Sequence, residues 1–162
     1  MQVRLNYAIY ILVLLAGLLI LSCLPGKTPN DQSLVYKAIL ESEKRRNNGA
    51  LSIDPFTRTK NVDIELIKKN EIISRQSDAF FDNATTIFSL NDSENVLYDL
   101  DIQGVTTSKV ADFWMSRIAF NNDNSIALVY VFNKSIEKSH NGAYFLLMKE
   151  NRTWRIVDRL FD

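Results

Sequence analysis

Four runs of β-branched and aromatic residues dominate the C-terminal part of the chain. They span residues 110–121, 125–132, 143–149 and 153–160. Polar, turn-forming residues 122–124 separate the first two runs, and residues 150–152 separate the last two, which is the spacing of β-hairpins. We therefore predict an antiparallel β-meander. Its last run alternates, with Trp154 and Ile156 on one face of the sheet and Arg155 and Val157 on the other.

The N-terminal half instead shows helical spacing. Apolar positions recur three to four residues apart over Ser33–Arg46, which predicts an amphipathic helix that Asp31 or Ser33 can cap. Residues 63–81 carry a similar but interrupted pattern, which predicts one or two helices. Helices are thus expected before the strands.

Shorter segments between these regions give weaker patterns. The alternation at Ala50–Ile53, followed by Asp54-Pro55, predicts a brief edge strand. Thr85–Leu90 is interpreted as a further strand, and Asn95–Ile102 as a short extended or helical piece. Because helices mainly precede strands, the fold class is α+β, with N-terminal helices packed on one face of a curved C-terminal meander. Cystatin-like or nuclear-transport-factor-like cones have this arrangement.

The first 22 residues have a different character. Residues 8–22 contain no charged side chain and follow a single basic residue, Arg4. A positive start, an apolar middle and a small residue at the end form the layout of a signal peptide. We therefore assign residues 1–22 to a signal segment, residues 23–32 to a polar tether and residues 33–162 to a single domain.

Cys23 is the one cysteine of the chain, so it cannot form an internal disulfide. The sequence Ile20-Leu21-Ser22-Cys23 resembles the bacterial lipobox, which implies that Cys23 is lipidated after cleavage. Two alternatives remain open: an uncleaved anchor helix over residues 7–24, which is close to the length that crosses a bilayer, and a cleaved, freely secreted protein. Both the lipidated form and the uncleaved anchor place the domain outside the cytoplasmic membrane, because the positively charged flank with Arg4 stays on the inner side.

Charge is balanced along the chain. The full chain has 19 basic and 19 acidic residues, and removing residues 1–22 removes Arg4 alone, which leaves 18 against 19 in a mature chain of 162 − 22 = 140 residues. This balance argues against a nucleic-acid partner. The densest basic run, residues 44–46, precedes Gly49 and is interpreted as a solvated helix end rather than a lipid-binding cluster.

Motifs in the four runs resemble those of a family of small bacterial exported domains. They are Ser-Arg-x-x-Phe-Asn at residues 116–121, Ala-Leu-Val-Tyr-Val at 127–131, Gly-x-Tyr to Leu-x-Lys at 142–149 and Trp-Arg-Ile at 154–156. The resemblance covers about a third of the chain and implies a shared fold. Residues 133–141 depart from it, since family members often carry a glycine-rich or cysteine-bearing segment there. The resemblance implies no catalytic residue.

The sequence offers little for catalysis or metal binding. His140 is the single histidine, so no multi-histidine metal site can form, and its polar surroundings favour an exposed loop. The five glycines build no nucleotide-binding loop and no nucleophile elbow. We therefore predict no catalytic residue, no metal and no cofactor.

A few polar residues still merit structural inspection. Arg117 interrupts an apolar run, so it either pairs with a carboxylate or lines a pocket, and the ion pair is favoured. The acid pairs Asp99 with Asp101 and Asp158 with Asp162 could each share a strand face, with solvated surface as the default interpretation. The aromatic residues of the meander are interpreted as core rather than pocket lining.

The function that follows is a membrane-tethered envelope lipoprotein whose domain binds a protein or small ligand without catalysis. Its ligand-binding residues are not identifiable from the sequence. The alternative is an envelope enzyme with a pocket at the end of the sheet that uses Arg117 and nearby carboxylates.

Overall fold

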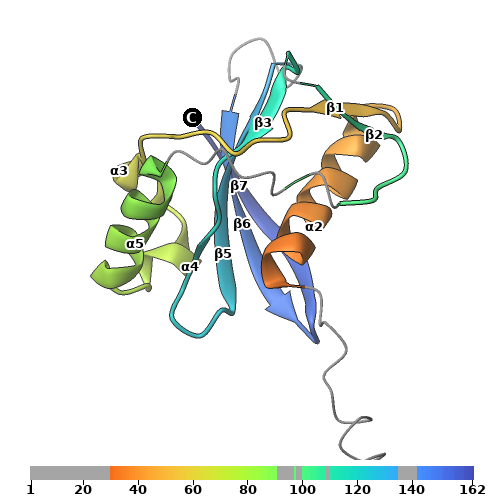
Figure 1. The fold of residues 1–162 in the computed structure, drawn as a ribbon. Coiled ribbons are helices and arrows are strands. Elements are labelled where there is room, and N and C mark those ends of the chain that lie inside the picture. Colours follow the sequence, from red (N-terminus) through yellow and green to blue (C-terminus); the bar gives the residue numbers. More distant parts are fainter. Residues whose placement is uncertain (1–29, 91–96, 98–99, 109, 135–141) are drawn as a thin grey trace, which may run out of the picture. The chain divides into compact units, whose positions relative to one another are not determined.

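The computed structural model describes residues 30–90, 97, 100–108, 110–134 and 142–162, and it confirms the α+β class (Figure 1). The elements in chain order are α2 (Asp31–Arg46), β1 (Leu51–Ile53), α3 (Ile64–Ile67), α4 (Glu71–Ser74), α5 (Asp78–Ser89), β2 (Val105–Thr107), β3 (Phe113–Met115), β4 (Ala119–Phe120), β5 (Ile126–Asn133), β6 (Gly142–Glu150) and β7 (Thr153–Phe161).

The predicted meander forms the main sheet. Its strands follow the order β3-β5-β6-β7, all neighbours are antiparallel, and β4 also pairs with β5. The first predicted run is divided into β3 and β4, because residues 116–118 leave the strand conformation between them. The predicted strand at Ala50–Ile53 is present as β1, and it pairs with β2 in a separate, parallel two-stranded sheet.

Helices cover both faces of the main sheet, so the prediction of helices on one face is wrong. Figure 1 shows α2 on one side of the strands and α3, α4 and α5 on the other. Two buried clusters result, one containing Val129 and Phe145 with α2 residues, the other Leu128 and Tyr144 with α5 residues. The near-continuous apolar run of β5 is the reason, since a strand without polar alternation must be buried on both faces.

Helix α2 has the predicted amphipathic pattern, and its first turn fixes it to the sheet. Val35, Ile39 and Leu40 are fully buried. Asp31 does not act as a cap: its carboxylate accepts hydrogen bonds from Lys149 Nζ at 2.8 Å and from Trp154 Nε1 at 3.1 Å. The hydrogen bond from Lys149 is the main reason that the pKa of Asp31 is lowered.

The other helical region continues further than expected. The predicted helices of residues 63–81 are α3, α4 and the start of α5, and Asn70 caps α4 through its side chain. The predicted strand at Thr85–Leu90 is wrong, because α5 extends to Ser89. The β-branched residues there suggested a strand, but Phe81, Ala84 and Phe88 recur at helical spacing and pack on the sheet.

A β-bulge changes the direction of side chains in β7. Leu146 pairs with Asp158 and Leu147 pairs with Ile156, so Val157 is an extra residue without a partner in β6. Trp154 and Ile156 pack in the α2-side cluster, as predicted, while Val157 packs in the other cluster. After the bulge, Arg159 returns to the α2 side, where it lies over the ring of Phe145 at 4.8 Å.

Several predictions lie outside the described residues. They concern the signal segment, Cys23, most of the tether, half of Asn95–Ile102 and His140. Within the described part of the chain, no helix combines the length and the apolar character that a membrane span requires.

Candidate functional site

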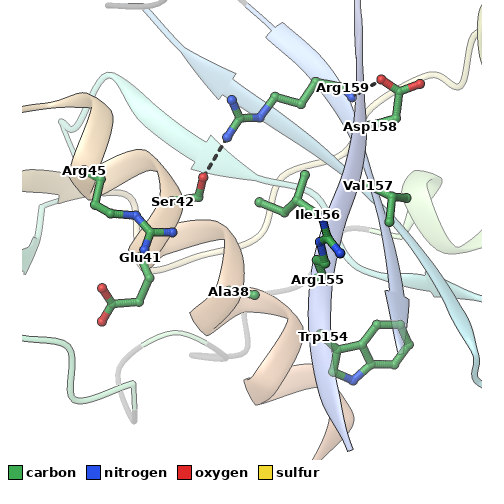
Figure 2. A pocket seen from close by; sticks show the side chains of 10 residues that line it. All are labelled: Ala38, Glu41, Ser42, Arg45, Trp154, Arg155, Ile156, Val157, Asp158 and Arg159. Atoms are coloured by element: carbon green, nitrogen blue, oxygen red, sulfur yellow. Dashed lines mark hydrogen bonds between the residues drawn. The ribbon is translucent and has the colours of Figure 1, made fainter. Parts of the chain in front are cut away.

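An open cavity of about 630 Å³ lies between α2 and the edge strand β7 (Figure 2). We call it the α2–β7 groove. Its lining residues are Ala38, Glu41, Ser42 and Arg45 from α2, and residues 154–159 from β7. The volume falls within the range of small-ligand pockets.

The groove exists because β7 is the last strand of the main sheet. Among the described strands, β7 pairs only with β6, so its other edge faces the groove. The helix lies alongside that edge, as Figure 2 shows for the side chains of both elements. Side chains from two elements therefore meet over one open strand edge.

Arg159 is held in a fixed position at one end of the groove. Its Nη2 donates a hydrogen bond to Ser42 Oγ at 2.7 Å, drawn in Figure 2, and lies 3.2 Å from Glu43 Oε1. The guanidinium also lies over the ring of Phe145. Partial burial lowers the pKa of Arg159, an effect that the nearby charge of Glu43 opposes.

Glu43 is a fully buried acid behind the groove. Its side chain is 0% exposed, and Arg159 and Arg46, the latter at 3.9 Å, are its basic neighbours. Burial raises the pKa of Glu43, and the two arginines only partly offset this effect. The buried pair thus positions Arg159 but holds the carboxylate in an unfavourable environment.

Two other arginines of the groove are exposed. The side chain of Arg45 has no ion pair or hydrogen bond among the described residues. Arg155 has only Glu150, at 3.9 Å, and both side chains of this pair are more than half exposed. Such a pair contributes little. Both guanidinium groups are therefore available to a ligand.

The two acids of the groove already have partners. Glu41 lies 3.2 Å from Lys44 Nζ. Asp158 accepts hydrogen bonds from the amide of Asn70 and from the backbone N–H of Arg159. The donors that bind Asp158 are neutral and leave its charge in place. Three arginines and two acids line the groove, so its net charge is still positive, which suits an anionic ligand.

The structure places Arg117 away from this groove. Arg117 lies between β3 and β4, close to Tyr36, whose buried hydroxyl donates to the carbonyl of Ser116 at 3.0 Å. Burial raises the pKa of Tyr36, and the charge of Arg117 partly opposes the shift. Arg117 lines neither the groove nor any of three smaller cavities that described residues line.

The predicted acid pairs are not assembled as a site. Asp162 pairs with Lys60 and accepts a hydrogen bond from Tyr130 at 3.2 Å, whereas Asp158 bonds Asn70. Asp101 is exposed, and Asp99 lies outside the described residues. No group of three His, Cys, Asp or Glu side chains in the described ranges could hold a metal ion.

Most aromatic side chains of the meander belong to the core, as predicted. Phe113, Tyr130, Tyr144 and Phe145 are all at most 4% exposed. Trp154 is buried as well, although it also borders the groove.

The groove was not predicted from the sequence, although two features of the sequence could have indicated it. Val35, Ile39 and Glu43 are spaced four residues apart, so Glu43 lies on the buried face of α2 and requires a basic partner. Residues 44–46 were interpreted as a solvated helix end, and they do form the last turn of α2. That interpretation did not anticipate that Arg45 would also line a groove together with β7.

The fold and the groove together define a small α+β domain with one open, cation-rich groove at the edge of its sheet. Comparison of the chain with protein-family models, with curated proteins and with solved structures finds no match. The resemblance to the family of exported bacterial domains therefore stays a prediction.

Proposed function

We propose that this protein is a membrane-tethered binding protein of the cell envelope, and that the α2–β7 groove is its binding surface. The observation that carries the proposal is the pair of available guanidinium groups, Arg45 and Arg155, over an open strand edge. Arginine and tryptophan are enriched at interfaces between proteins, and Trp154 also lines the groove.

The proposed tether follows from the sequence. The uncharged segment of residues 8–22 ends at Cys23, and α2 begins at Asp31, eight residues later. Eight extended residues span at most about 28 Å. If Cys23 carries the lipid, the domain operates close to the membrane surface.

Binding fits this groove better than chemistry does. A general base needs an acceptor within hydrogen-bond reach of the substrate proton. Both lining acids, Glu41 and Asp158, are engaged by neighbours, and Glu43 is buried behind the groove. The unengaged groups are cations, which bind anions without any reaction.

Fractionation of cells tests the location. The unchanged protein is expected in the membrane fraction, and Cys23→Ala is expected to lose the lipid-dependent part of this association. A soluble cytoplasmic position of both forms would contradict the proposed location.

Photo-crosslinking in intact cells tests the groove. A photoreactive phenylalanine analogue replaces Glu41, which lines the groove, or Thr86, which is exposed on α5 as a matched control. Discrete adducts are expected from position 41 and not from position 86. Equal adducts from both positions, or none from position 41, would show that the groove is not the binding surface.

A further inference from the structure

We propose that the α2–β7 groove binds an acidic segment of a partner protein, whose carboxylates pair with Arg45 and Arg155. This inference rests on the proposed function and specifies the chemistry of the partner. It follows from three properties of the groove: its available charges, its fixed arginine and its blocked strand edge.

The available charges select an anion. Arg45 and Arg155 project from different elements, one from the last turn of α2 and one from β7, and both line the same cavity. Glu41 is paired with Lys44, and Asp158 forms no ion pair with either arginine among the described residues. A ligand that presents two carboxylates can therefore engage both arginines, and arginine binds carboxylates with two parallel hydrogen bonds.

Arg159 gives the groove a rigid end. Its guanidinium contacts Ser42, Glu43 and the ring of Phe145 at once, so its side chain is already ordered in the free domain. A side chain that is ordered before binding loses less conformational entropy when a ligand arrives. The buried Glu43 thus acts as a positioning residue for Arg159.

The edge of β7 does not favour addition of a partner strand. The bulge at Val157 interrupts the ladder. The N–H of Arg159 is also occupied, because it donates to Asp158 Oδ1 at 2.8 Å. Bulges and charged side chains are common protections of edge strands. The partner segment is therefore recognised through its side chains, in the space between helix and strand.

A protein fits these features better than a lipid headgroup. Arg45 lies fourteen residues after Asp31 in α2, which places it about 21 Å along the helix from the end that joins the tether. Two available arginines are also fewer than the roughly four to eight basic residues of clusters that bind anionic lipids.

The test measures peptide binding to the full-length protein in a neutral detergent by fluorescence anisotropy. The probe is a fluorescein-labelled octapeptide of alternating Glu and Ala, and its matched control has Gln in place of Glu. We expect the Glu peptide to bind at low salt, more weakly as salt rises, and the Gln peptide to bind at least roughly fivefold more weakly.

Two double variants locate the binding. Arg45→Gln with Arg155→Gln is expected to weaken binding of the Glu peptide by roughly fivefold or more. Arg75→Gln with Arg152→Gln removes two exposed arginines that do not line the groove, and it is expected to leave affinity unchanged. Circular dichroism checks that all forms are folded.

Three results would overturn the inference. The Glu and Gln peptides could bind equally well, or both double variants could lose the same affinity for the Glu peptide. Short-chain phosphatidylglycerol could also compete with the labelled peptide as effectively as unlabelled Glu peptide does. Crosslinks from position 41 in cells, combined with no affinity for the Glu peptide, would reject the acidic partner and retain the proposed function.

Discussion

At the scale of single residues, Glu43 shows how a buried charge supports the groove. It orders Arg159, yet its own carboxylate is fully buried, and burial raises its pKa. Replacing both partners of a buried ion pair with apolar groups is often neutral or stabilising, whereas removing one partner is costly when the other charge is left buried. Arg159 is 24% exposed, so solvent still reaches its charge. The ion pair therefore contributes to the geometry of the groove more than to the stability of the fold.

The first prediction concerns the dependence of stability on pH. A raised pKa means that the folded state binds the proton of Glu43 more tightly than the unfolded state does. The contribution of Glu43 is therefore most favourable below its unfolded pKa and is lost as pH rises through the folded pKa. Glu43→Gln should remove this slope in urea unfolding and should be at least as stable as the unchanged protein at pH 7.

Glu41→Gln is the matched control, since Glu41 lies two residues away and forms only a partly exposed ion pair. It should change the free energy of unfolding by less than about 0.5 kcal/mol and should leave the slope intact. A loss of stability in Glu43→Gln at pH 7 would mean that attraction to Arg159 exceeds the cost of burial.

The second prediction concerns close packing at Gly142. A Cβ atom at this position would lie 1.9 Å from the Tyr130 hydroxyl oxygen and 2.4 Å from Tyr130 Cζ. The ring is held by Tyr144 at 5.1 Å and by the hydrogen bond to Asp162. Gly142→Ala should therefore reduce the free energy of unfolding by about 1–3 kcal/mol, measured by urea denaturation.

A double-mutant cycle with Tyr130→Ala tests the cause of this loss. Without the ring, Gly142→Ala should cost close to nothing, so the two changes should be strongly non-additive. Additive losses would indicate that backbone freedom at Gly142, rather than the contact with Tyr130, determines the effect.

Single residues also mark the limit of the sequence reasoning. Arg117 was selected because it interrupts an apolar run, but it lies beside Tyr36 and outside the described cavities. Arg45 and Arg159 are separated by more than a hundred residues, and a bulge decides which way Arg159 points. No pattern within either segment reveals that they line one groove.

At the scale of elements, the docking of α2 depends on its first turn. Asp31 bonds Lys149 of β6 and Trp154 of β7, so one carboxylate joins the helix to two strands. The hydrogen bond from Lys149 lowers the pKa of Asp31 below its usual value of 3.8. The helix is thereby fixed along the edge that forms the groove.

The third prediction follows from this contact. Asp31→Asn should reduce the free energy of unfolding by about 0.5–1 kcal/mol at pH 7, a modest value because the pair is partly exposed. A lowered pKa gives stability that is present above the unfolded pKa and is lost as pH falls through the folded pKa. The difference from the unchanged protein should therefore close in acid, as the carboxyl of Asp31 becomes protonated in the folded state.

Asp82→Asn provides the control for this experiment, because Asp82 is exposed on α5. It should have little effect at either pH. A loss in Asp31→Asn that persists in acid would contradict the prediction, because it would show that the charge of Asp31 does not anchor the helix.

The elements that the sequence predicted correctly are those with strong local patterns. The helix at Ser33–Arg46 and the runs that became β5, β6 and β7 are present within a few residues of their predicted ends. Thr85–Leu90 was mistaken for a strand, because its β-branched residues outweighed the helical spacing of the phenylalanines. The helices within residues 63–81 were predicted, but their position on the second face of the sheet was not; the apolar run of β5 requires it.

At the scale of the whole molecule, the chain contains two parts that differ in composition, an apolar N-terminal segment and a folded unit. Residues 31–162 form one unit with apolar clusters on both faces of its main sheet, and the groove lies at the edge of this unit. The preceding segment is the uncharged run that ends at Cys23. The proposed function requires that this segment deliver the domain to a membrane surface.

The most direct test of the tether is mass spectrometry of the N-terminal peptide from protein extracted out of native membranes. The fourth prediction is that the mature chain begins at Cys23, that residues 1–22 are absent, and that Cys23 carries acyl chains. Detection of an unmodified Cys23 within a chain that still contains residues 1–22 would contradict the account.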